Sequence, residues 1–454
     1  MLGLLRFREL GCAPPDGFPL QLSVMSLRAR ALQLAPHLEV KTAHSSGVRS
    51  LDLERKYGRF LLAGDAAGSL AVYDASPEPT RPHGNSGTGG AQVARRQMGP
   101  TVAKPIARVV KAHKYAIAAV CWYPADPGLF VSAAYDGLVR AWDADSLQAV
   151  LDFEMHGRVY AIAISPVAAS HGLIAVGSEE ASIRLCDLRS GAHAHVLRAH
   201  SSPVWSVAWS PTQPHTLASG SQDCRAFVWD IRRPSPMHSL ERGRGALATG
   251  GGREGGGGGS EGGMGDGGRP SQRRRSATHD GGVNGLCFSP CGTELLTFGK
   301  DDKLRLWDVG GGAYLNVHYE AVANAAPRNV TFASSACSMG CSHAHAYVPC
   351  GRQLHVYEWS TGRLRGRLRG HFERINTVTL GKDGACDEVL FSGSDDHSIA
   401  AWAPPNDRLG LFPQPAAPIS GGRRGGNGNA GGRQGARTAA HAEEREADAW
   451  SDED

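Results

Sequence analysis

Residues 199–233 constrain the fold most, because they contain a complete unit that recurs in weaker copies along much of the chain. The unit reads AHSSPVWSVAWSPTQPHTLASGSQDCRAFVWDIRR, with a His followed by apolar stretches at 204–209, 216–219 and 226–229. Alternation of apolar residues and the turn residues Gly220 and Asp223 predict short strands joined by tight turns. A sheet this small cannot bury its faces alone, so the repetition predicts several such sheets packed side by side.

The other copies are found by the same landmarks: a His before the first strand, an Asp in the second turn and a Trp-Asp pair ending the third strand. This is the pattern of a WD repeat, which forms one blade of a β-propeller. The turn position that normally contains Asp is occupied by Ala67 in the first copy and by Glu180 in the third copy. The landmarks give seven blades: His44 with Tyr73, His113 with Trp142, His156 with Cys186, His200 with Trp229, His279 with Trp307, Tyr357 alone, and His371 with Trp402. We therefore predict an all-β chain with a seven-bladed WD-repeat propeller over residues 36–404.

Each full blade combines a His, a hydroxyl residue, an Asp and a Trp, which suit either a catalytic triad or a structural hydrogen-bond chain. A nucleophile is needed once, in a cleft, whereas these residue types recur in blade after blade. We interpret them as structural staples, in which Asp bonds His, His bonds the hydroxyl and the hydroxyl bonds the Trp indole. The predicted staples are His113, Ser132, Asp136 and Trp142; His200, Ser219, Asp223 and Trp229; His279, Thr297, Asp301 and Trp307; and His371, Ser392, Asp396 and Trp402. No catalytic residue, no cofactor and no enzyme activity are expected.

Residues 1–35 precede the first repeat and are rich in leucine. Their spacing predicts short helices that either pack on the propeller or dock into a groove of a partner. Residues 37–42 are predicted to form a single strand that completes the last blade and closes the ring.

Residues 76–104 and 241–276 are rich in Gly and polar residues, and residues 405–454 are rich in Gly and Arg and then acidic. Such sequences bury too little apolar surface to fold, which predicts two disordered inserts and a disordered tail. The arginines at 273–275 are either a nuclear address or solvated charge, and the acidic end is either a docking motif or a solubilising tail.

Composition excludes several classes of protein. No apolar run is long enough to span a bilayer, and the first ten residues lack a secretory pattern, so we expect an intracellular protein. The formal net charge of +4 gives no case for nucleic acid or a membrane surface. Most cysteines lie singly in strand-like runs, as in reducing compartments. One cluster matches no common zinc-finger spacing, so we favour a degenerate blade over a metal site there: Cys337, Cys341, His343, His345 and Cys350.

Several segments carry a resemblance beyond the repeats. They are MLGLLRFREL, AHSSGVRSLDLERKYGRFLLAGDAAGSLAVYD, VCWYPADPGLFVSAAYDGLVRAWD, LIAVGSEEASIRLCDLRSG, GGVNGLCFSPCGTELLTFGKDDKLRLWD and DAWSDED. In this order they resemble the Cockayne syndrome A family of WD-repeat proteins, although the inserts, the Gly/Arg-rich tail and Ala67 depart from it. The resemblance implies a nuclear substrate receptor of a cullin-4 RING ubiquitin ligase, which presents client proteins for ubiquitination in transcription-coupled nucleotide excision repair.

The resemblance also implies where the ligase attaches. Receptors of this class bind the damaged-DNA-binding adaptor subunit through an N-terminal helical segment and a Trp-Asp-x-Arg box. The matching residues in this chain are Leu2, Leu4, Leu5 and Phe7 in the segment, Trp229, Asp230 and Arg232 in the box, and Asp187 and Arg189 in a partial copy. The arginine either meets the adaptor or bonds within its own blade. The alternative function is a general scaffold of a nuclear chromatin or RNA-processing complex, without ligase attachment.

Client proteins are expected at one mouth of the central channel. Residues on either side of the first buried aliphatic of each innermost strand should point there. The predicted channel-mouth residues are Arg49, Arg158, Tyr160, Trp205, Asn284, Arg374 and Asn376, whereas Ala116 and Ala118 leave a gap. Basic and aromatic residues favour an acidic peptide with an apolar anchor over single-stranded nucleic acid, given the small net charge. No small-molecule ligand and no membrane partner are expected.

Overall fold

Each copy of the repeat forms one antiparallel sheet in the computed structural model. The structure describes residues 32–35, 38–75, 101–167, 171–242, 277–324, 339–342, 344–381 and 389–403. Tight turns bring each alternating stretch back alongside the previous one, so the strands pair in chain order. The described residues form a seven-bladed β-propeller, as the landmarks predict, and contain strands but no helix.

The strands of each blade follow one another from the centre of the ring outward. Blade one contains β3 (Val48–Leu53), β4 (Phe60–Asp65), β5 (Leu70–Asp74) and β7 (Pro105–Val109), and blade two contains β8 (Ile117–Trp122), β9 (Leu129–Ala134), β10 (Leu138–Asp143) and β11 (Ala149–Glu154). Blade three contains β12 (Val159–Ile164), β13 (Leu173–Ser178), β14 (Ser182–Asp187) and β15 (Ala192–Arg198), and blade four contains β16 (Val204–Trp209), β17 (Thr216–Ser221), β18 (Ala226–Asp230) and β19 (His238–Ser239). Blade five contains β20 (Val283–Phe288), β21 (Glu294–Gly299) and β22 (Lys303–Asp308). In blade six, the short strand β23 (Gly340–Cys341) pairs with β24 (His345–Cys350), and β25 (Gln353–Glu358) and β26 (Leu364–Arg369) follow. Blade seven contains β27 (Ile375–Leu380), β28 (Leu390–Ser394), β29 (Ile399–Ala403) and β1 (Gln33–Leu34).

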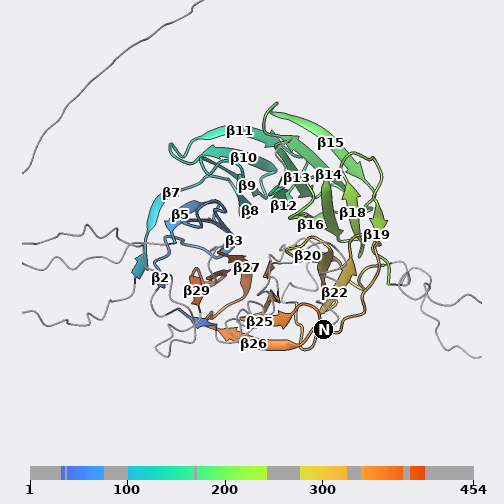
Figure 1. Cartoon of the computed structure of the whole chain (residues 1–454). Coiled ribbons are helices and arrows are strands. Elements are labelled where there is room, and N and C mark those ends of the chain that lie inside the picture. The colour runs from blue at the N-terminus through green and yellow to red at the C-terminus, as the bar shows by residue number, and fades with distance from the viewer. Residues whose placement is uncertain are drawn as a thin grey trace, which may run out of the picture. The chain divides into compact units, whose positions relative to one another are not determined.

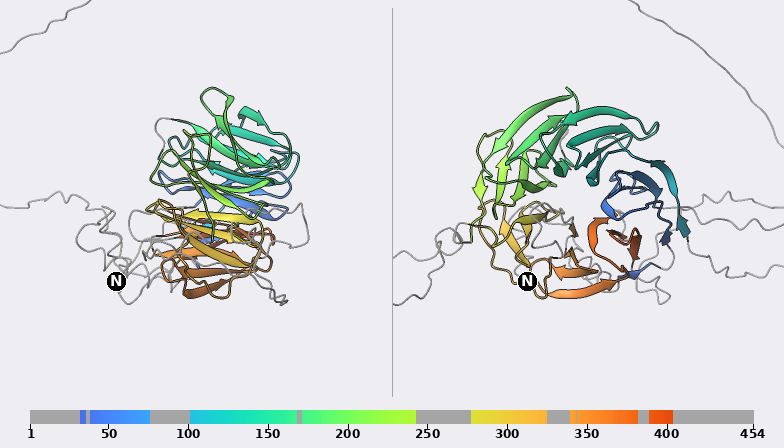
Figure 2. Two further views of the ribbon diagram at one scale, coloured as in Figure 1. Left: turned by 90° about the vertical axis from the view of Figure 1, so that its right-hand side faces the viewer. Right: turned by 180° about the vertical axis from the view of Figure 1, so that it is seen from behind.

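The blades are arranged in a ring, with the innermost strands toward the centre and β7, β11, β15 and β26 outside (Figure 1). Successive innermost strands contact one another, and β27 returns to β3 (Figure 2 shows the ring from the side and from behind). The apolar core is divided among the junctions: each hydrophobic cluster of the described residues joins two neighbouring blades. One blade therefore buries its faces only against its neighbours, as expected for a propeller.

The ring closes at a different place from the predicted one. Residues 37–42 do contain a strand, β2 (Leu38–Val40), but it pairs in parallel with β6 (Thr101–Ala103) instead of completing blade seven. The closing strand is β1, which pairs antiparallel with β29 and lies inside the segment predicted to be helical. Leu32 and Ala35 are buried, and the two residues between them are exposed. The ring is therefore closed by a segment of four residues, which is too short to show the alternating pattern of a strand. The docking residues Leu2, Leu4, Leu5 and Phe7 lie outside the described residues.

The predicted inserts and tail are only partly described. The first insert was expected to reach residue 104, but it contains the strand β6. Arg242, at the start of the second expected insert, donates to the Asp280 carboxylate at 2.8 Å and to the Ala277 carbonyl at 3.1 Å, which ties the two sides of this insert together. Residues 76–100, 243–276 and 404–454 lie outside the described residues. No helix in the part of the chain that is described is long and apolar enough to cross a bilayer.

The β1–β29 pairing yields a test of ring closure. The Ala35 N–H donates to the Ala401 carbonyl at 2.8 Å, so Ala35→Pro removes this donor and leaves a buried acceptor unpaired. We expect the free energy of unfolding, measured by urea denaturation, to fall by about 1–3 kcal/mol. Gln33→Ala keeps the main-chain pairing and is the control. Equal stability of the two variants would mean that β1 does not close the ring.

Candidate functional site

Four blades contain the full staple. In blade four, His200 Nδ1 lies 2.9 Å from Asp223 Oδ2, and His200 Nε2 lies 2.8 Å from Ser219 Oγ. The Trp229 indole N–H donates to the same hydroxyl at 2.8 Å. Blades two, five and seven repeat this chain with the residues predicted for them: His113, Ser132, Asp136 and Trp142; His279, Thr297, Asp301 and Trp307; His371, Ser392, Asp396 and Trp402.

The hydroxyl residues of these four staples, Ser132, Ser219, Thr297 and Ser392, are completely buried. A substrate would have to displace the blade core to reach them, and each hydroxyl already bonds both an imidazole and an indole. The geometry therefore favours a structural role for the staples.

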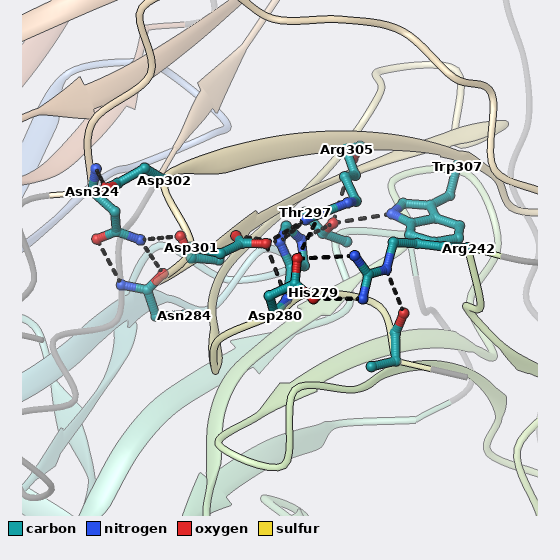
Figure 3. Close-up of polar contacts among 12 residues, drawn as sticks. Arg242, His279, Asp280, Asn284, Thr297, Asp301, Asp302, Arg305, Trp307 and Asn324 are labelled. Atoms are coloured by element: carbon teal, nitrogen blue, oxygen red, sulfur yellow. Dashed lines mark hydrogen bonds and ion pairs between the residues drawn. The ribbon is translucent and has the colours of Figure 1, made fainter. Parts of the chain in front are cut away.

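Blade five has the most elaborate staple (Figure 3). His279 Nδ1 lies 2.8 Å from Asp301 Oδ1, and the Arg305 guanidinium contacts the imidazole and donates to Asp301 Oδ2 at 2.8 Å. Burial lowers the pKa of His279 to about 4, against the opposing effect of Asp301. Burial raises the pKa of Asp301, but the hydrogen bond with His279 and the nearby charge of Arg305 outweigh this effect, so the net shift is downward. The imidazole is thus held neutral beside a carboxylate.

Blade one differs from its prediction. Ala67 replaces the expected turn Asp, but Asp65, two residues earlier, accepts the role: its Oδ2 lies 3.0 Å from His44 Nδ1. Ala63 occupies the position of the hydroxyl, so His44 Nε2 makes no hydrogen bond among the described residues. Tyr73 replaces the Trp, and its hydroxyl accepts the Ala43 N–H at 3.1 Å. The first blade therefore has an incomplete staple.

Blades three and six have no His–Asp pair of this kind among the described residues. Glu180 accepts hydrogen bonds from the Arg184 guanidinium at 2.9 and 3.0 Å, and Cys186 Sγ lies 3.4 Å from His193 Nδ1. In blade six the Tyr357 hydroxyl lies 3.1 Å from His355 Nδ1 and donates to the Glu320 carbonyl at 2.8 Å. These blades are held mainly by their apolar junctions.

One backbone irregularity recurs around the ring at the predicted channel-mouth positions. In six blades, the pairing of the innermost strand shifts register just after its first buried aliphatic, so that one residue has no partner. A bulge of this kind re-aims the side chain of the extra residue. The bulged residues are Arg49, Ala118, Tyr160, Trp205, Asn284 and Asn376. Five of them are predicted channel-mouth residues, and the sixth is the predicted gap.

A second set of residues joins the mouth, and the sequence pattern did not predict it. In each of five blades, the residue directly before the acidic turn residue donates its N–H to a backbone carbonyl near the start of the innermost strand. The carbonyl belongs to the residue that precedes the first buried aliphatic of that strand, as in the bond from Tyr135 to Ala116. These second-set residues are Tyr135, Glu179, Gln222, Lys300 and Asp395. Their position before the turn acid is a sequence signal that could have found them.

Burial separates the mouth residues into two groups. Tyr160 and Trp205 are each only 3% exposed, and Asn284 and Asn376 are buried too, so these four side chains do not form an open surface. Asn284 exchanges amide hydrogen bonds with Asn324 (Figure 3). The Arg49 and Arg374 side chains are partly exposed, and Arg158 is exposed. The expected gap at blade two is occupied by Tyr135, whose ring lies 5.9 Å from the Tyr160 ring.

Positive charge gathers at this mouth. Asp395 lies between two arginines, 3.8 Å from Arg49 Nε and 3.3 Å from Arg374 Nη2. Burial raises the pKa of the Tyr135 hydroxyl, and the positive charges of Arg49, Arg374 and Arg158 oppose this rise. The ammonium of Lys300 lies 4.2 Å from the centroid of the Trp205 ring, and burial lowers the pKa of Lys300.

The Trp-Asp-x-Arg box lies at the other end of the blade-four sheet. β18 pairs with β17 so that Ala226 is next to Gly220 at the mouth end, whereas Asp230 is next to Thr216 at the far end. The Arg232 guanidinium donates to both Asp230 oxygens, at 2.9 and 2.7 Å, which lowers the pKa of Asp230 to about 2. Arg232 therefore bonds within its own blade, yet its side chain is 66% exposed. In the partial copy, Asp187 accepts the Arg189 N–H at 3.1 Å.

No group of three or more His, Cys, Asp or Glu side chains in the described parts of the chain is placed to hold a metal ion. Of the cysteine and histidine cluster, Cys337 and His343 lie outside those parts. Cys341 donates to the Phe288 carbonyl at 2.9 Å, and His345 and Cys350 stand at opposite ends of β24.

The staple of blade four can be tested at its central hydroxyl. Ser219→Ala leaves a buried indole N–H and a buried imidazole nitrogen unpaired, so we expect the free energy of unfolding to fall by about 1–3 kcal/mol. Ser201→Ala, at an exposed residue of the same blade, is the control. The reverse change, Ala63→Ser, should stabilise blade one by about 0.5–1.5 kcal/mol by giving His44 Nε2 a partner. A neutral Ser219→Ala variant would disprove the structural role.

The neutral imidazole of blade five makes stability depend on pH. The unfolded state takes up a proton near pH 6.5 but the folded state only near pH 4, so His279 contributes fully above pH 6.5 and its contribution is lost as pH falls to about 4. The shift corresponds to roughly 3 kcal/mol. Urea unfolding between pH 7.5 and 4.5 should therefore show a shallower pH dependence in His279→Gln than in the parent chain. The exposed His195→Gln is the control, and parallel curves for both variants would contradict the assignment.

Comparisons with known proteins agree with this architecture. The model of the WD domain, G-beta repeat, matches residues 104–143, 191–230, 271–308 and 362–403. WD repeat-containing protein ATCSA-1 of Arabidopsis thaliana is 31% identical over 443 residues, covering 88% of this chain and 94% of its own length. The ribosome biogenesis protein WDR12 homolog of Chlamydomonas reinhardtii is 35% identical over 29% of this chain and 30% of its own length, and radiation-sensitive protein 28 of Saccharomyces cerevisiae is 26% identical over 43% and 38%. Because the match to the Arabidopsis protein runs over nearly all of both chains and not over single repeats, this chain belongs to the same WD-repeat protein family.

Proposed function

We infer that this chain is a non-catalytic substrate receptor of a cullin-4 RING ubiquitin ligase, acting in the nucleus in transcription-coupled nucleotide excision repair. It would bind the damaged-DNA-binding adaptor subunit and present client proteins for ubiquitination. The observation that carries this proposal is the nearly full-length match to the Arabidopsis protein ATCSA-1. That name agrees with the resemblance of the non-repeat segments to the Cockayne syndrome A family.

The two ends of the sheets offer separate surfaces for the adaptor and for the client. A receptor must hold the ligase and the client at the same time, which requires two separate surfaces. Arg232 is exposed at the far end of blade four, where its guanidinium is oriented by Asp230 and keeps donors for a partner. The channel mouth lies at the opposite end of the same sheet. We assign the far end to the adaptor and the mouth to the client.

A general scaffold remains the second candidate. Its support is the set of partial matches to ribosome biogenesis proteins, which cover about a third to a half of this chain. A WD propeller is a protein-interaction fold in either case, so the distinction depends on the adaptor.

The test is co-purification of the adaptor with tagged variants. Deleting residues 1–31 removes the predicted docking helices but keeps β1, and Arg232→Glu reverses the charge at the far end. We expect each change to reduce adaptor recovery at least about tenfold, because a charge-assisted contact and buried apolar area are lost. Arg225→Glu makes the same charge reversal at an exposed residue just before β18, at the mouth end, and should not affect recovery.

Thermal unfolding of all variants must match the parent, so that loss of the adaptor is not loss of the fold. Undiminished recovery with both variants would reject the ligase assignment in favour of the scaffold. Recovery lost equally with Arg225→Glu would indicate a general charge effect.

A further inference from the structure

We propose that the channel mouth binds a phosphorylated serine or threonine side chain of a client protein, held by Arg49, Arg158 and Arg374 around Tyr135. This assignment rests on the proposed function only in taking the mouth as the client surface. It adds the chemistry that a client must present there.

The first argument is the convergence of three guanidinium groups. Arg49 of blade one and Arg374 of blade seven both contact Asp395, at 3.8 and 3.3 Å, so these two side chains meet. Their charges and that of Arg158, from blade three, all oppose the rise in the pKa of the Tyr135 hydroxyl in blade two. Like charges brought together repel unless an anion lies among them. Asp395 has a single negative charge and contacts both Arg49 and Arg374, so it offsets only part of the charge of these two arginines.

The second argument is that the arginines are positioned and still have donors to offer. Arg374 Nε donates to Asn376 Oδ1 at 3.0 Å, and Asn376 donates in turn to Asp395 at 2.8 Å and to the Val48 carbonyl at 2.9 Å. The Arg49 Nε makes no hydrogen bond among the described residues. Each guanidinium has five N–H donors, and those that these contacts do not use can bond a ligand where the partly exposed side chains of Arg49 and Arg374 reach the surface.

The third argument concerns the shape and charge of the anion. A carboxylate presents two oxygens in one plane, whereas a phosphate monoester presents three and carries about −1.5 to −2 charges at pH 7. Guanidinium groups bond carboxylate and phosphate oxygens alike, and a phosphate offers one more oxygen to groups that come from different blades. The two sets of mouth residues contain these three arginines and Lys300, but only two carboxylates, those of Asp395 and Glu179. Positive charge is therefore in excess, and a dianion fits this excess.

A peptide fits this mouth better than nucleic acid does. Single-stranded nucleic acid needs aromatic faces on which bases stack, but Tyr160 and Trp205 are each only 3% exposed. The exposed aromatic residues near the staple histidines are Phe372, 82% exposed, and Tyr115, 53% exposed. They stand in the loops that lead into the innermost strands of blades seven and two, where they can anchor apolar residues flanking a phosphorylated position.

The test uses three fluorescent degenerate peptide libraries with a central phosphoserine, serine or glutamate. Binding to the full-length protein is measured by fluorescence polarisation. We expect the phosphoserine library to bind at least about tenfold more tightly than the serine library, and the glutamate library to fall between them. The preference should decline as pH falls through about 6, where the phosphate takes up a proton.

Two variants with opposite expected effects on phosphoserine binding keep the test independent of folding. The double variant Arg49→Gln/Arg374→Gln should abolish the preference for phosphoserine. Asp395→Asn removes the competing carboxylate but keeps an acceptor for Asn376, and should strengthen phosphoserine binding several-fold. Arg59→Gln, an exposed arginine paired with Asp74 at the far end of blade one, is the control and should bind like the parent.

Equal binding of the three libraries, or no gain in Asp395→Asn, would overturn the proposal. A single-stranded oligonucleotide that binds more tightly than the peptides and is lost in the double variant would assign the mouth to nucleic acid instead. Adaptor recovery is measured with the same preparations. A parent chain that prefers phosphoserine but recovers no adaptor would reject only the ligase assignment. A parent chain that recovers the adaptor but shows no such preference would reject only the phosphate site.

Discussion

Burial of both faces of every sheet against its neighbours is the constraint on which this structure depends. Each apolar cluster lies between two blades, so a blade that lost a neighbour would expose half of its core. The ring must therefore close, and β1 closes it by pairing with β29. This dependence also explains why the staples can vary. Blades three and six lack the His–Asp pair among their described residues, but they contribute to the same kind of junction as the complete blades.

The parts of the fold that the sequence predicts well are those decided locally. A His, a turn Asp and a Trp at fixed spacing within one blade specify a hydrogen-bond chain, and in blade four its distances are 2.9, 2.8 and 2.8 Å. The predicted ring closure is wrong because the observed closure depends on a pairing between residues 33 and 403, which are far apart in the sequence. A strand of two residues also has no recognisable alternating pattern. The role of Asp65 escapes prediction for a related reason: a carboxylate two residues from the expected position reaches the same imidazole because the turn geometry compensates.

The region proposed to meet a client shows the same limit. Alternation identifies which residues leave the innermost strands toward the channel, but it does not say how deeply they lie. Tyr160 and Trp205 are buried, whereas the side chains of Arg49 and Arg374 are partly exposed. A bulge has no sequence signature of its own, so the arrangement of these side chains follows from the three-dimensional pairing. Tyr135 escapes prediction because it belongs to a turn, and only the fold brings its ring within 5.9 Å of the Tyr160 ring of the next blade.

The separation of stability from recognition follows from where these residues lie along each sheet. The interblade clusters occupy the strands, whereas the bulged residue Arg49 and the turn residues lie at one end of the sheets and Asp230 with Arg232 lies at the other. A change of charge at either end removes little buried apolar area, so it alters what the surface attracts more than whether the blade folds. Two partners bound at opposite ends do not compete for the same surface. Under the function proposed above, an adaptor and a client would therefore occupy opposite ends of the sheets.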